Sequence, residues 1–151
     1  MSSSAVRSGI RSFLNSNSNE SVVDLTGEFE ELRELLAESN VQPDAPWLGL
    51  EFIGSSEEPV SLSADNTKGL YREDGIVQLH ICAVARIGVG SNLESRAETL
   101  RNLFRGRRIG GIVVDSVSPI NTGPGATLEF DAGYVSGTVS VTYHYDFSPG
   151  A

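Results

Sequence analysis

The sequence contains little that could cross-link the chain or anchor it in a membrane. Cys82 is the only cysteine, which excludes an internal disulfide. We expect its thiol to be buried and inert, because free cysteines are among the most buried residues. No apolar run approaches the roughly 18 residues that a membrane-spanning helix needs. The first residues also lack the apolar core of a signal peptide, so we expect a protein made and kept in a cytoplasm.

Cations are scarce as well. The chain of 151 residues has 11 Lys and Arg against 20 Asp and Glu, which gives a formal net charge of −9. Holding nucleic-acid phosphates or an anionic membrane surface requires clustered cations, so bulk electrostatics favour neither. The negative charge instead suits a surface that DNA passes without specific binding. The length fits one domain, residues 1–151.

Motifs for catalysis and nucleotide binding are also missing. Gly88 and Gly90 could begin a G-x-G-x-x-G fingerprint, but Leu93 stands where the third glycine belongs. No phosphate-binding G-x-x-x-x-G-K-[ST] loop and no G-x-S-x-G elbow occurs. His80 and Cys82 share a strand face, yet the sequence offers no third group to orient them. We therefore expect no enzyme activity and no cofactor.

One weak metal or small-molecule site is conceivable near the C-terminus. His144 and Asp146 share a face of a predicted strand, and Glu129 or Asp131 could lie opposite them. A polar cross-strand ladder explains the same residues without a ligand, and zinc-type spacing is absent. We favour the ladder over a metal- or small-molecule-binding domain.

A strand, a tight turn and a helix are predicted between Gly75 and Gly106. Apolar residues at every second position indicate a half-buried strand, and a glycine-rich turn ends it. Ser91 and Glu94 have the spacing of a capping box, and Gly106 stands where a left-handed residue ends the helix. The apolar strand positions are Val77, Leu79, Ile81, Ala83, Ala85 and Ile87, and the helix stripe is Leu93, Ala97, Leu100 and Phe104.

Further helices and strands are expected on both sides of this unit. The pattern predicts an amphipathic helix at about Ser4 to Asn15 and a brief extended piece at Val22 and Val23. A second helix follows, with an acidic run from Glu28 to Glu38 that is either a solvated face or a contact for a basic partner. The other strands are expected at Trp47–Ile53, Ile112–Val117, Thr127–Tyr134 and Val139–Phe147.

Together these elements predict an α+β fold. We expect a mixed or antiparallel sheet of about four or five strands with two or three helices packed on it. A turn at Ser136 and Gly137 would join the last two strands into a hairpin with one apolar and one polar face. Trp47, the only tryptophan, is expected to anchor the core or an interface.

Two segments are candidate contact sites. From Gly54 to Asp74, about twenty residues show no clear periodicity, and such a loop is usually functional or mobile. It is either an arm that docks on a neighbouring chain or a disordered surface loop. The expected contact residues in this segment are Val60, Leu62, Leu70, Tyr71 and Arg72.

The second candidate is the basic cluster of Arg105, Arg107 and Arg108 after the central helix. Because the C-terminus of a helix favours cations, part of the cluster needs no further function. The rest predicts a contact with an acidic or phosphate-bearing surface, and the net charge of −9 favours a protein over DNA.

The features between about Ala45 and Phe147 follow a recognisable order. Ala45-Pro-Trp-Leu-Gly-Leu50 leads into a strand, and the long loop ends in Gly69-Leu-Tyr-Arg-Glu-Asp-Gly75. A strand, the glycine turn, the Ala-x-x-Leu-x-x-x-Phe helix and a terminal hairpin follow. This order resembles that of the tail-terminator, or tail-completion, proteins of long-tailed bacteriophages. The acidic helix between Asn19 and Val41 departs from the pattern expected of that family.

The resemblance implies a structural protein of the virion neck, assembled in the host cytoplasm. Members of that family form a ring, expected here to be a hexamer, that caps the tail tube and ends its elongation. Tail tube protein and a head-completion or connector protein are the implied partners, and DNA would pass through the central hole. Another head–tail connector or stopper component is the nearest alternative.

Overall fold

The computed structural model of the protein describes residues 3–26, 35–36, 45–60, 69–84, 89–121 and 134–148. In these residues the chain forms the helices α1 (Ser4–Asn17) and α3 (Val89–Phe104) and a six-stranded sheet. The strands are β1 (Ser21–Asp24), β2 (Trp47–Pro59), β3 (Tyr71–Val84), β4 (Arg108–Ile109), β5 (Ile112–Val117) and β6 (Tyr134–Phe147). Most of the expected acidic helix and nearly all of the expected Thr127–Tyr134 strand lie outside the described residues.

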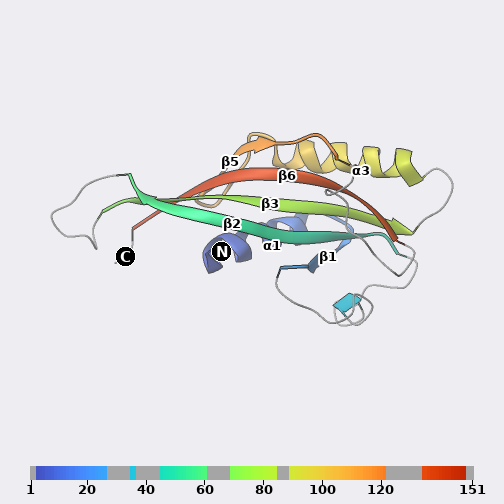
Figure 1. The fold of residues 1–151 in the computed structure, drawn as a ribbon, viewed down its shortest axis with the longest axis horizontal. Coiled ribbons are helices and arrows are strands. Elements are labelled where there is room, and N and C mark those ends of the chain that lie inside the picture. Colours follow the sequence, from blue (N-terminus) through green and yellow to red (C-terminus); the bar gives the residue numbers. More distant parts are fainter. Residues whose placement is uncertain are drawn as a thin grey trace.

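The sheet is mixed and has the strand order β1-β2-β3-β6-β5-β4. β1 runs parallel to β2, and the other neighbouring strands are antiparallel. Figure 1 shows the long strands β2, β3 and β6 curving together, with α3 on the β6 side and α1 on the β2 side. The predicted α+β class, with helices packed on a mixed sheet, is confirmed. The two-residue strand β4 was not expected, because it is too short to show a periodic pattern.

Both helices bury their apolar stripes in one core, so they cover the same face of the sheet. Phe104 of α3 meets Phe13 of α1 edge to face, with ring centroids 5.2 Å apart. Burying a side chain of this size stabilises the fold by ~1.5–3 kcal/mol. The core contains Val6, Ile10 and Leu14 of α1, the four predicted stripe residues Leu93, Ala97, Leu100 and Phe104 of α3, and Leu48, Leu50, Phe52, Val77, Leu79, Ile81, Val139, Val141 and Tyr143 of the sheet.

A smaller apolar cluster contains the only tryptophan and the only cysteine. Trp47 and Cys82 oppose each other across β2 and β3, and both are fully buried, as predicted. Val23, Leu25 and Leu36 complete the cluster. Burial raises the pKa of the Cys82 thiol far above its usual range, so the thiol stays protonated and unreactive.

The structure corrects the loop expected between Gly54 and Asp74. β2 continues to Pro59 and β3 begins at Tyr71, and the two strands pair along this stretch beyond a bulge in β2. The β2 half is exposed on both faces, so no apolar alternation marks it as a strand. Backbone hydrogen bonds to β3 hold this half of β2 in the sheet. We call residues 53–60 and 70–76 the β2–β3 arm.

Two local predictions are also wrong. Ser136 and Gly137 lie within β6, so the expected turn of a terminal hairpin is absent there. Pairing with the end of β3 outweighs their local preference for a turn. α3 begins at Val89, which places Ser91 inside the helix and removes the predicted capping box. Gly106 has a φ of 67°, which confirms the left-handed residue expected after the helix.

Gly75 allows an aromatic ring to close the core at the base of the arm. It opposes Tyr143 across β3 and β6, and the Tyr143 ring lies over the glycine. The Tyr143 hydroxyl donates to Glu73 Oε2 at 2.8 Å, and the Ser3 amide donates to Oε1 at 3.1 Å. Because Ser3 is the N-cap of α1, the buried carboxylate ties that helix to the sheet at the end where negative charge is favoured.

We expect Gly75→Ala to destabilise the fold by about 1–3 kcal/mol. The added Cβ would lie 2.3 Å from the Tyr143 hydroxyl oxygen, and the buried ring cannot move without losing its bond to Glu73. Urea unfolding followed by the fluorescence of Trp47 measures the loss. Gly111→Ala is the control, since its Cβ would be 3.1 Å from the partly exposed Tyr145 ring. Equal losses in the two variants would contradict this account.

Candidate functional site

The β2–β3 arm carries a group of exposed apolar side chains. Among the described residues, the large apolar side chains with the highest exposure, 39–42%, are Ile53, Val60, Leu70 and Ile76, and all of them lie on this arm. Single exposed apolar residues are common, but four along one pair of strands make the arm a candidate contact surface. Val60 and Leu70, two of the predicted contact residues, are joined by a backbone hydrogen bond at the arm's tip. Leu62 lies outside the described residues.

The other predicted arm residues bind β3 to β6. Tyr71 stacks on Phe147, which stacks on Tyr145, with centroid distances of 6.1 and 5.8 Å. Arg72 donates from Nε and Nη2 to the two carboxylate oxygens of Asp146 at 2.7 and 2.9 Å. These hydrogen bonds hold the pKa of the Asp146 carboxyl below its usual range. Tyr71 and Arg72 therefore stiffen the arm from within the subunit.

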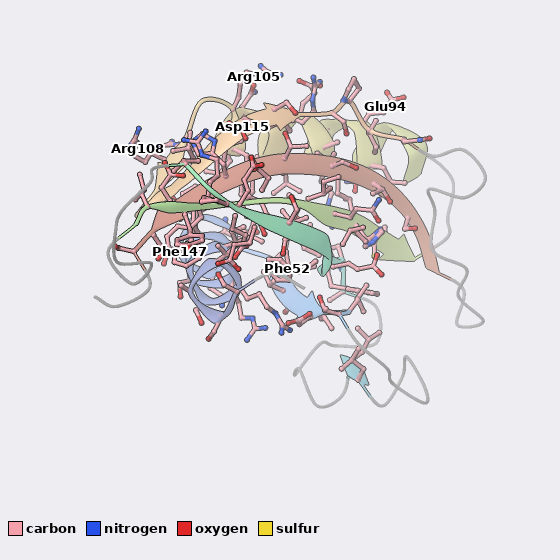
Figure 2. All side chains as sticks on the ribbon, turned by 60° about the vertical axis from the view of Figure 1, so that its left-hand side comes forward. Phe52, Glu94, Arg105, Arg108, Asp115 and Phe147 are labelled. Carbon is pink, nitrogen blue, oxygen red and sulfur yellow. The ribbon has the colours of Figure 1, made fainter. Side chains whose placement is uncertain are left out.

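The predicted basic cluster follows α3 and is exposed. Arg105 donates to the Asn102 side chain, and Arg107 donates to the Leu103 carbonyl. Arg108 lies in β4 and has no acidic partner among the described residues. Figure 2 shows Arg105 and Arg108 at the outer surface, directed away from the core. We call Arg105, Arg107 and Arg108 the basic edge.

A shallow hollow lies on the sheet where β2 and β5 are bulged. Its volume is about 390 Å³, and it opens between the two bulges. Asp74, Ile76 and Thr142 contribute to its lining, together with Asp115 of β5. The mixture of two carboxylates with an isoleucine suits a contact with a protein side chain better than a buried ligand site.

The conceivable metal site divides into two separate cross-strand pairs. His144 Nδ1 lies 2.7 Å from Asp115 Oδ1, whereas Asp146 is held by Arg72. Glu129 and Asp131 lie outside the described residues. In the part of the chain that the structure describes, no three His, Cys, Asp or Glu side chains are grouped to hold a metal ion. His144 and Asp146 therefore each have a polar cross-strand partner, Asp115 and Arg72, and the part of the expected ladder that involves Glu129 and Asp131 stays a prediction.

One polar arrangement that the sequence analysis missed crosses three strands. His80 Nδ1 lies 2.8 Å from Thr138 Oγ1, and His80 Nε2 lies 3.0 Å from Glu51 Oε1. Hydroxyl, imidazole and carboxylate occur in this order in nucleophilic triads. Thr138 and His80 are only 3% and 2% exposed, however, so a substrate cannot reach the hydroxyl. The arrangement joins β2, β3 and β6 through a buried imidazole.

Comparison with known proteins establishes similarity of fold alone. Neither a family model nor a curated protein matches the sequence. Solved structures do match, and one of them shares 18% sequence identity with a TM-score of 0.50. That alignment covers 95% of this chain and 97% of the other chain. Within the described residues, no helix has the length and apolar character needed to span a membrane.

We expect the fold to lose stability as the pH falls below about 6.5, the ordinary pKa of histidine. Burial lowers the pKa of His80, although the Glu51 carboxylate acts in the opposite direction. The unfolded chain therefore binds this proton at a higher pH than the folded protein does. Below that pH, the free energy of unfolding should decrease by at most about 1.4 kcal/mol per pH unit. Thermal unfolding between about pH 8 and pH 5 measures the effect.

Two variants assign that pH dependence to one residue. His80→Gln removes the titrating imidazole and should flatten the profile between about pH 7 and pH 5. His144→Gln, which changes the partly exposed histidine, should keep the His80 contribution. A His80→Gln profile parallel to that of the wild type would assign the loss to another group.

Proposed function

We propose that this protein is a tail terminator of a long-tailed bacteriophage, a structural subunit that forms a ring on the end of the tail tube. The proposal starts from the order of sequence features between Ala45 and Phe147. Three of those features belong to one folded unit, because Trp47 begins β2, Tyr71 begins β3, and α3 packs on the core formed by the same strands. The 18% identity with a solved structure adds fold similarity and no function.

The grouping of exposed apolar side chains on the β2–β3 arm carries this proposal. Soluble proteins rarely keep such a group on one element unless it meets a partner. The arm forms one end of the sheet, at the left of Figure 1, where it can reach a neighbouring subunit. A ring closes by head-to-tail contacts, in which each copy places one surface against a different surface of the next. An arm and a separate receiving surface suit that requirement.

The proposed mechanism is geometric. One face of the ring matches the last ring of the tail tube and blocks further addition of tube protein. The other face receives a head-completion or connector protein, and DNA passes through the central hole. A net charge of −9 disfavours retention of the DNA phosphates, which suits such a passage. No bond is made or broken in this function, so it requires no catalytic residue or cofactor.

Another head–tail connector or stopper component is the second candidate. The exposed arm supports ring formation for either protein, so the partner decides between them. A pull-down from assembling phage separates the two functions: the proposed terminator should retain tail tube protein, whereas a stopper should retain portal-proximal protein. Among the described residues, His144 and Asp146 belong to separate cross-strand pairs and do not support the metal- or small-molecule-binding alternative.

We expect purified protein, alone or with tail tubes, to form rings of about six copies that cap the tubes. Light scattering gives the mass of the rings, and negative-stain images show capped ends and tube length. Val60→Ser combined with Leu70→Ser should weaken ring formation, because it removes the apolar tip of the arm while keeping its backbone. Thr99→Ala, on the exposed side of α3, should leave the rings intact.

Two results would contradict the tail-terminator function. One is a protein that leaves tail tubes uncapped and their length unlimited. The other is turnover of a small substrate that His144→Gln or Asp146→Asn abolishes. A serine double variant of the arm that forms rings as readily as the wild type would instead remove the arm from the subunit contact.

A further inference from the structure

Charges of opposite sign remain unpaired at two separate edges of the sheet. Several charged side chains meet a partner within the subunit, as Arg72 does with Asp146. The basic edge contacts only neutral acceptors or none. Glu57 and Glu58 of β2 are exposed, and in the described part of the chain neither forms an ion pair, since Arg72, which stands opposite Glu58, is bound to Asp146. We call Glu57 and Glu58 the acidic edge.

The acidic edge lies where β2 is the outermost described strand. β1 pairs only with the first four residues of β2, so the described sheet ends at β2 beside the arm. The Val60 amide donates a hydrogen bond to the carbonyl of Leu70, which directly precedes β3. Because backbone groups alternate in direction along an antiparallel strand, the backbone nitrogen of the preceding residue points away from β3. That position is Pro59, which has no amide hydrogen to donate. Proline is typical of an outward position on an edge strand.

The two edges lie at opposite borders of the sheet but at the same level along the strands, so lateral rows of paired residues run from one edge to the other across β3, β6 and β5. One such row runs from Ser56 through Asp74, His144 and Val113 to Arg108. No ion pair joins the two edges among the described residues of one subunit. They are therefore two different, oppositely charged surfaces at one end of the same sheet. Contact between different surfaces of identical chains is the kind that propagates around a ring.

We propose that the acidic edge of each subunit faces the basic edge of the next subunit in the ring. Glu57 and Glu58 would pair there with Arg107 and Arg108 of the neighbouring copy. The exposed apolar residues of the arm lie on the same two strands as the acidic edge and would pack beside these ion pairs. Charged pairs of this kind fix orientation and register, while the apolar group supplies affinity. The inference rests on the proposed ring and names the surfaces that form it.

Two charge-reversal variants test the contact. E57K/E58K makes both edges basic, and R107E/R108E makes both edges acidic. We expect each variant alone to associate about tenfold or more weakly than the wild type, because like charges then face each other. An equal mixture should regain association as alternating copies, since every contact again joins a basic to an acidic edge. Both variants keep a net negative charge, so bulk attraction cannot explain recovery.

Sedimentation velocity at about 0.05 M salt measures association, and about 1 M salt should weaken it by screening the exposed pairs. E94K/E98K is the matched control for E57K/E58K, because it makes the same change in net charge on the exposed face of α3. Figure 2 places Glu94 at the far end of α3 from Arg105 and Arg108. This control should associate like the wild type. Circular dichroism of each variant confirms that it is folded.

Three results would overturn the edge contact. They are a wild type that stays monomeric at low salt, a reversal variant that associates normally alone, and a mixture that stays dissociated. If R107E/R108E still associates but binds DNA more weakly than the wild type does, the basic edge contacts DNA phosphates rather than a neighbouring subunit. The proposed function can fail separately from the edge contact. If the mixture restores association but the wild-type protein never caps tail tubes, the edge contact stands and the tail-terminator function is wrong.

Discussion

Both helices occupy the same face of one sheet, and this constraint decides which surfaces the molecule can offer. α1 and α3 meet through Phe13 and Phe104 and share the apolar sides of β2, β3 and β6. The core ends at Tyr143 and Glu73, where a buried carboxylate binds a tyrosine hydroxyl and the start of α1. Past these two residues β2 and β3 remain paired to Pro59 and Tyr71 and form the outer part of the β2–β3 arm. Backbone pairing maintains the arm, so its outward side chains are available for contacts.

The proposed ring uses this division between a packed body and an exposed end. The arm brings apolar side chains and the acidic edge to one border of the sheet, and β4 brings the basic edge to the other. Within the subunit, Arg72 with Asp146 and the stacked rings of Tyr71 and Phe147 hold the arm on β6. A stiff arm loses little conformational entropy when it docks, which favours a defined assembly geometry.

Local patterns predicted part of the candidate site. Consecutive arginines after a helix identified the basic edge, and Val60 and Leu70 were expected as contacts, although their segment was expected to be a loop. Glu57 and Glu58 were not singled out, because two acidic residues in an acidic chain carry no signal until their strand is known to be an edge. The contacts of His80 were missed for a similar reason: Glu51 and Thr138 come from strands whose register the sequence does not reveal.

The sequence by itself determined which apolar residues of α3 and β3 face the core. The α3 stripe and the alternating residues of β3 follow from backbone geometry, because helix and strand periods fix which side chains share a face. Only the tertiary structure decided which strands are neighbours and where the sheet ends. It made Ser136 and Gly137 part of β6 and placed Arg108 in the same row as Ser56. Strand pairing joins residues distant in the chain, and their register depends on the whole packed sheet rather than on local pattern.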